Sequence, residues 1–306
     1  MKNIMKHLKS CNALVMLMLL ISVAVYAQDS RDVRCTFKYN IEWGEGTKKM
    51  NLKIAVPYSI ENRQEILKLA FSVIPDTMYE IDGNRYAEYT FTKKPDDMLL
   101  MVAYARLYRA DYDNIPKEKT LEPLSPEELT RYLQSERFIE VNDEDIQKKA
   151  ANLKDKTQIK TVSNICKFVH NSVKYKVLNQ LIGAVETLKT LKGDCKEYSY
   201  LFTAFCRADS IPARTVKGLT LYWPKNYKGF HAWVEVYLDG IGWIPVDPTH
   251  NADFKTFDNK YLFLAQPIID NVLGSGAVCT WRYWGDRGFV RVTPVMYIDD
   301  IKIKVE

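Results

Sequence analysis

The sequence predicts an α+β protein in which a small all-β domain precedes a domain of helices packed on an antiparallel sheet. Residues 35–112 alternate apolar and polar side chains with a period of two, which is typical of half-buried strands. Residues 125–173 repeat apolar side chains every three or four positions, which is typical of helices, and the alternation returns after residue 213. Because the helices precede the second set of strands as a group, the second domain is expected to be α+β.

Composition divides the 306 residues into three parts. The first 27 residues combine early lysines, an apolar run from Ala13 to Val25 and small residues up to Ala27, which is the pattern of an export signal. A polar connector at 113–126 contains Pro116 and Pro123, ends at Pro126 and separates the two folded parts. We therefore expect a signal peptide at 1–27, a β-sandwich at 28–118 and a second domain at 119–306. The mature protein is expected to be periplasmic or extracellular, without a stable membrane anchor.

The pattern also predicts individual elements. In the first domain we expect strands over 37–43, 50–56, 67–73, 87–91 and 99–107. In the second, Ser125-Pro126 and the acidic run 142–145 predict helix starts, and spaced apolar residues predict a third helix over 159–173. Further strands are expected at 213–222, 230–238, 243–246, 261–264, 289–292 and 301–305.

Charge and cysteine content exclude some classes of function. The formal net charge of +5 falls to +2 without the predicted signal, which carries three lysines and no acid, and this argues against a nucleic-acid binder. Five cysteines then remain, an odd number in an exported protein, so one reactive free thiol is expected. Cysteines and histidines lack the spacing of a zinc site, so we expect no metal and no other cofactor.

Gly193-Asp194-Cys195 stands directly before a run with an apolar stripe at helical spacing. The glycine permits a sharp turn, so Cys195 is expected in the first turn of a helix. Free backbone N–H groups and the helix dipole favour a thiolate there and can hold an oxyanion. A second interpretation, in which Cys195 is buried or disulfide-bonded and merely begins a helix, is equally open from position alone.

His231 begins a predicted strand, and a glycine-containing turn at 239–242 leads from this strand to Asp247. If the connecting loop has three or five residues, residues of the same parity share one face of the hairpin. With residue 238 opposite 242, Asp247 lies opposite residue 233 and diagonal to His231. The two side chains are then within reach, and a carboxylate-oriented histidine can act as the base for a thiol.

Four blocks, 193–195, 207–214, 231–236 and 242–249, resemble the core of the transglutaminase-like superfamily over about residues 126–255. The resemblance implies a papain-like fold with a Cys-His-Asp catalytic triad, which corresponds to Cys195, His231 and Asp247. The first domain also resembles the small domain that precedes this core in bacterial members. No acidic loop resembles the calcium sites of the animal crosslinking enzymes.

Trp223 and Tyr227 lie in a loop just before His231, where aromatic side chains can grip a substrate. An alternative is that Trp223 only packs on the edge of the sheet.

The predicted function is an exported, cysteine-dependent amide hydrolase or acyltransferase that acts on a peptide or protein through a thioester on Cys195. Hydrolysis is slightly favoured over crosslinking because water is always present. The alternative is a non-catalytic binding or assembly protein that keeps the fold. Substrate, acceptor and oligomeric state stay open.

Overall fold

The computed structural model describes residues 29–96, 98–111, 123–221, 230–250, 256–267, 269–275 and 278–301. The predicted signal at 1–27 therefore lies outside the described residues. In the part of the chain that is described, no helix is long and apolar enough to cross a membrane.

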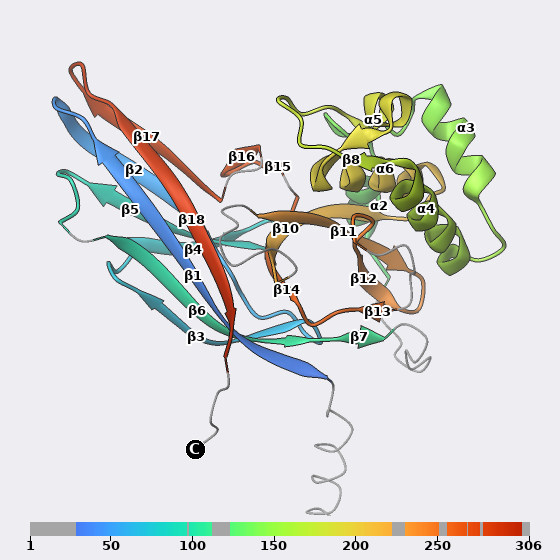
Figure 1. Ribbon diagram of the computed structural model, residues 1–306, viewed down its shortest axis with the longest axis horizontal. Coiled ribbons are helices and arrows are strands. Elements are labelled where there is room, and N and C mark those ends of the chain that lie inside the picture. The colour runs from blue at the N-terminus through green and yellow to red at the C-terminus, as the bar shows by residue number, and fades with distance from the viewer. Residues whose placement is uncertain are drawn as a thin grey trace, which may run out of the picture.

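Two four-stranded antiparallel sheets form a sandwich, at the left of Figure 1. One sheet has the order β18 (Val290–Asp300), β1 (Ser30–Trp43), β6 (Leu99–Tyr108), β3 (Gln64–Phe71). The other has the order β17 (Cys279–Gly285), β2 (Thr47–Val56), β5 (Asn84–Phe91), β4 (Thr77–Ile81). Apolar side chains from both sheets form one buried cluster, so the predicted alternation reflects one face turned inward and one turned outward.

The last two strands correct the predicted domain boundary at the C-terminal end. β17 pairs with β2 and β18 pairs with β1 over its whole length, so both belong to the sandwich and not to the second domain. Sequence alternation identifies a strand but not its partner, and these strands lie more than 200 residues from the strands that they pair with. Figure 1 shows the long red strands beside the blue ones.

The second unit packs helices on one face of a four-stranded sheet with the order β12 (Gly242–Val246), β11 (His231–Leu238), β10 (Ala213–Thr220), β14 (Tyr261–Ala265). Its helices are α2 (Pro126–Leu133), α3 (Glu144–Leu153), α4 (Gln158–Ser172), α5 (Ala184–Thr190) and α6 (Cys195–Ala208). Two-residue strands form three more pairs: β7 (Ala110–Asp111) with β13 (Thr256–Phe257), β8 (Lys174–Tyr175) with β9 (Lys192–Gly193), and β15 (Ile269–Asp270) with β16 (Gly274–Ser275).

Local chemistry accounts for the helix starts. Ser125 and Glu128 form a reciprocal capping box with Pro126 in the first turn of α2, and Asp143 caps α3. Apolar residues of α4 line a buried face that packs around α6, which is itself almost completely buried. The second unit is therefore built around α6.

A buried charge cluster joins the sandwich to the second unit. Glu235 on β11 accepts hydrogen bonds from Arg63 (2.8 Å) and from Arg214 (2.6 and 2.8 Å), while Arg63 also donates to the carbonyl of Trp243. Burial by itself would raise the pKa of Glu235, but the two guanidinium groups hold it below the usual range. The guanidinium of Arg214 stacks over the ring of Trp243 at 4.0 Å.

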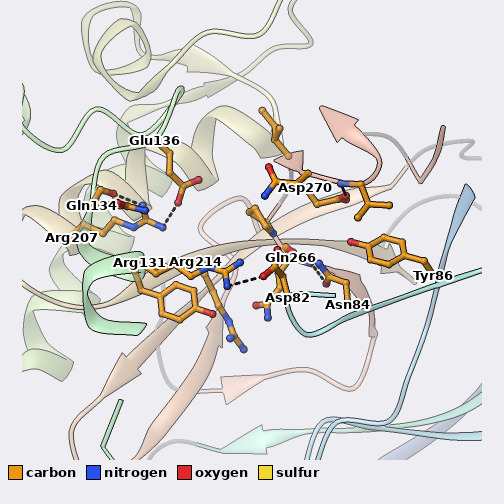
Figure 2. A pocket seen from close by; sticks show the side chains of 15 residues that line it. Asp82, Asn84, Tyr86, Arg131, Gln134, Glu136, Arg207, Arg214, Gln266 and Asp270 are labelled. Atoms are coloured by element: carbon orange, nitrogen blue, oxygen red, sulfur yellow. Dashed lines mark hydrogen bonds and ion pairs between the residues drawn. The ribbon is translucent and has the colours of Figure 1, made fainter. Parts of the chain in front are cut away.

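A cavity of about 270 Å³ opens between the two units near the C-terminal end of α6. Figure 2 shows that its charged groups are paired with one another, Arg207 with Glu136 (2.7 Å) and Arg131 with Asp82 (3.3 Å). Asp270, which also lines it, pairs with the fully buried Lys217 at 2.5 Å. Because these charged groups form ion pairs with one another, we interpret the cavity as part of the contact between the two units. Cys195 lies at the opposite end of α6.

Candidate active site

Cys195 is the first residue of α6, as the sequence predicts. The side chain of Asp194 caps the helix by accepting from the second and third backbone N–H groups, and Glu197 reciprocates by accepting the N–H of Asp194 at 2.9 Å. This leaves the N–H of Cys195 itself without an acceptor among the described residues. Cys195 is buried, with 5% of the residue exposed.

His231 and Asp247 meet as the strand parity predicts. Leu238 pairs with Gly242 across a three-residue loop and Val234 pairs with Val246, so Asp247 follows in the predicted register. Nε2 of His231 donates to Oδ2 of Asp247 at 2.6 Å, and both side chains are buried.

His231 reaches Cys195 from the end of β11 and not from the face of β11 that packs on α6. Alternate β11 residues, including Ala232 and Val234, pack against α6, whereas Trp233 belongs to a separate apolar cluster on the other face. His231 contacts Cys195 from the first position of β11, at the end of the strand beside the start of α6.

Electrostatics favour a protonated His231. Burial lowers its pKa, but the charge of Asp247 and hydrogen bonds to Asp247 and Cys195 outweigh burial and raise the pKa to about 10. Burial likewise tends to raise the pKa of Asp247, whereas His231, His250 and Tyr261 hold it below its usual range. An imidazolium beside a thiol stabilises the thiolate.

Two further groups orient Asp247, and sequence reasoning missed both. The hydroxyl of Tyr261 on β14 donates to Oδ2 at 2.7 Å, and the backbone N–H of Thr249 donates to Oδ1 at 2.9 Å. The Thr249 contact is a local turn that an aspartate two residues earlier often makes. No sequence signal links Tyr261 to the site, because β14 joins the sheet next to β10 on the side away from β12.

His250 lies against His231 with 4.9 Å between ring centroids, and burial lowers its pKa. One potential ligand atom from each of His231, Asp247 and His250 lies within 4.8 Å of the others. These three groups are the candidate metal ligands among the described residues, although a metal would have to displace the proton that joins His231 to Asp247. The expectation of no metal and no cofactor stays a prediction.

Glu197 is a titratable group beside the nucleophile position. It is 1% exposed, and its Oε1 has no hydrogen-bond partner among the described residues. Burial and the neighbouring Asp194 raise its pKa to about 7. The folded state therefore holds this proton more tightly than the unfolded chain does, and folding becomes less favourable as the pH rises from about 4.5 to 7.

Replacing Glu197 with Gln should remove this pH dependence. The unfolding free energy of the variant minus that of wild type should be roughly 1 to 3 kcal/mol larger at pH 8 than at pH 4.5. Urea denaturation of both proteins at the two pH values measures the difference. A gap that does not change with pH would contradict the assignment to Glu197.

The cysteines fall into two chemical groups. All five described cysteines are free thiols, so the disulfide that would support the non-catalytic alternative is not formed by Cys195. Burial raises the pKa of Cys35, Cys206 and Cys279, which keeps these thiols protonated and inert. Cys166 is fully buried in the core of the second unit. Trp223 and Tyr227 lie outside the described residues, so their predicted substrate contacts stay predictions.

Parts of the sequence and of the fold are similar to known proteins. The family model of the transglutaminase-like superfamily matches residues 147–248. A stretch of 101 residues is 32% identical to an uncharacterized protein of Haemophilus influenzae, covering 26% of this chain and only 27% of that protein. A candidate cysteine protease from Cytophaga hutchinsonii superposes with a TM-score of 0.64 at 19% identity, covering 91% of this chain and 93% of its own. The periplasmic domain of TgpA from Pseudomonas aeruginosa gives a TM-score of 0.39 at 15% identity, covering 71% and 87%.

A helix that begins at a cysteine and packs on an antiparallel sheet defines the class of papain-like folds, as predicted. Within that class, residues 147–248 match the family model of the transglutaminase-like superfamily, which supports the predicted family for this part of the chain. The likeness to the Cytophaga protein extends over nearly the whole chain and shows a shared fold that includes the sandwich. The family is one of thiol-dependent enzymes.

Proposed function

We propose that the protein is an exported thiol hydrolase or acyltransferase that acts on amide bonds of peptides or proteins, with Cys195 as nucleophile. The observation that supports this most directly is that His231, hydrogen-bonded to Asp247, lies beside Cys195 at the start of a helix. The export signal pattern in residues 1–27 supports a periplasmic or extracellular location.

The roles follow from which atoms are already engaged. Asp247 holds Nε2 of His231, so Nδ1 is the ring nitrogen left to exchange a proton with the thiol of Cys195. The thiolate attacks the amide carbonyl carbon, and the N–H of Cys195 at the helix start donates to the oxyanion that forms. His231 then gives its proton to the departing amine, the C–N bond breaks, and a thioester remains.

The second half of the reaction mirrors the first. Water or an amine attacks the thioester, His231 accepts its proton, and the thiolate leaves with the sulfur–carbon bond broken. We favour water as the acceptor. Tyr261 and Thr249 keep the carboxylate of Asp247 fixed while His231 changes charge.

Mass spectrometry of a peptide and amine pool tests the proposal. Wild type should produce cleavage, loss of ammonia or amine incorporation, and Cys195→Ala should produce none of these. Peptide mapping after iodoacetamide treatment should show Cys195 modified ahead of the other four described cysteines. Identical products from the two proteins, together with an unreactive Cys195, would favour the non-catalytic alternative.

Replacing Tyr261 with Phe should lower turnover by about threefold to tenfold, because one hydrogen bond that orients Asp247 is lost. Steady-state kinetics with any substrate found in the peptide pool measures the loss. Tyr58→Phe is a matched control, since the hydroxyl of Tyr58 donates to the backbone of Gly83 and not to the triad. Equal effects of the two changes would show that Tyr261 acts only through general stability.

A further inference from the structure

The strands that lead into Cys195 carry a pair of like charges. In the β8–β9 pair, Lys174 is the register partner of Lys192, which stands three residues before Cys195. Like charges directly opposite one another destabilise strand pairing. The stability lost by placing Lys174 opposite Lys192 therefore calls for an explanation.

The rest of the protein avoids this arrangement. Every other register pair of two charged residues in the described strands joins opposite signs, and these are Asp32 with Arg106, Arg34 with Asp299, Glu42 with Arg291, Lys53 with Glu88, Glu65 with Arg106, Glu80 with Arg85, and Arg214 with Glu235. Lys174 and Lys192 are the exception within the described part of the chain.

A third lysine extends the pair. The backbone N–H of Lys176 donates to the carbonyl of Gly193 at 2.8 Å, which continues the ladder beyond β8. Residues two apart in an extended chain point to the same side, so Lys174, Lys176 and Lys192 share one face and form what we call the lysine strip. All three are exposed, and none makes an ion pair with another described residue.

The lysine strip lies beside the nucleophile and next to exposed apolar surface. The Cα atom of Lys192 is at most about 11 Å from that of Cys195, because the two residues are only three positions apart in the chain. Tyr175 and Val177, which alternate with the lysines, are 45% and 70% exposed, and the ring of Tyr175 lies 6.4 Å from that of Tyr198 on α6. Figure 1 shows β8 next to α5 and α6.

We propose that the lysine strip binds carboxylates of the acyl donor, so that the enzyme selects acidic peptide segments. This inference rests on the proposed function of Cys195 and names its substrate class. Three uncompensated cations on one face raise the local concentration of anions and orient them before the thiol reacts. The cost of placing Lys174 opposite Lys192 is offset when a carboxylate lies between them.

Two small alkylating agents test the inference without a known substrate. Iodoacetate and iodoacetamide deliver the same carbon to Cys195, but only iodoacetate is an anion. Each lysine about 10 Å away should change the iodoacetate rate by about twofold in dilute buffer, and salt should screen the effect. The rate constant for iodoacetate divided by that for iodoacetamide should therefore fall about fourfold to eightfold in the strip variant, Lys174→Gln/Lys176→Gln/Lys192→Gln. The same ratio should fall by a similar factor for wild type in 0.5 M NaCl.

A charge-matched control is Lys48→Gln/Lys49→Gln/Lys68→Gln, which removes three lysines from strands of the sandwich. It should keep the wild-type ratio. Peptides with Glu flanking the reactive amide should then be turned over faster than the same peptides with Gln, and this preference should vanish in the strip variant alone.

The outcomes separate the two proposals. If Cys195 reacts selectively but the ratio is the same in wild type and strip variant, the lysine strip does not bind anions and the inference is overturned while the catalytic proposal stands. If Cys195 is unreactive toward both reagents, the catalytic proposal itself fails. Equal rate changes with iodoacetamide would mark a structural effect of the substitutions and would also overturn the inference.

Discussion

Replacing His231 with Gln is expected to lower turnover by about 10⁴-fold or more, the largest loss of any change that leaves Cys195 in place. The glutamine amide can still donate to Asp247, so the buried carboxylate keeps a partner, but it can neither accept the proton of the thiol nor return it to a leaving amine. Steady-state kinetics and the rate of alkylation by iodoacetamide measure the two consequences separately.

The pH dependence sharpens this prediction. Because Asp247 raises the pKa of His231 to about 10, wild type should keep the imidazolium beside Cys195 from pH 6 to 9, and this cation should assist alkylation over the whole range. In His231→Gln the rate should be lower at neutral pH and climb as the pH rises. A profile that is identical in both proteins would show that His231 does not interact with the thiol.

Replacing Glu235 with Gln is expected to lower the free energy of unfolding by about 3 to 5 kcal/mol. The side chain of Glu235 is 3% exposed and is shared by Arg63 and Arg214, each 18% exposed, so the change leaves two largely buried guanidinium groups without a counter-charge. Denaturant unfolding at pH 7 measures the loss. Glu80→Gln, which breaks an exposed pair with Arg85, should cost less than about 1 kcal/mol.

Acid should abolish this difference. Since the pKa of Glu235 is below its usual range in the folded protein, its contribution to stability is present above the unfolded-state pKa and is lost as the pH falls through the folded-state value. The stability gap between wild type and Glu235→Gln should therefore begin to narrow below the unfolded-state pKa of about 4.3 and should shrink further as the pH falls. A gap of the same size at pH 7 and pH 3 would contradict an ionic origin.

Much of the site could be predicted because its determinants are local. Gly193-Asp194 places Cys195 at a helix start, and the alternation after His231 places that residue on a strand. The loop length then fixes the register that brings Oδ2 of Asp247 to 2.6 Å from Nε2 of His231. Each of these steps depends on residues close together in the sequence.

The parts that could not be predicted depend on distant segments. Tyr261 reaches Asp247 only because β14 pairs with β10, and Arg63 reaches Glu235 only because the sandwich packs against the second unit. The partners of β17 and β18 were missed for the same reason. Alternation shows which face of a strand is buried, but nothing within the strand identifies the segment that it pairs with.

The return of β17 and β18 to the sandwich makes the transglutaminase-like unit an insertion between two halves of another domain. During synthesis, Cys195, His231 and Asp247 all leave the ribosome before the strands that complete the sandwich edges. A chain cut after about residue 275 would keep every proposed catalytic residue, yet each sheet of the sandwich would lose an edge strand and expose a new one to intermolecular pairing. Aggregation of such a fragment would thus reflect the loss of the edge strands of the sandwich and not damage to the proposed triad.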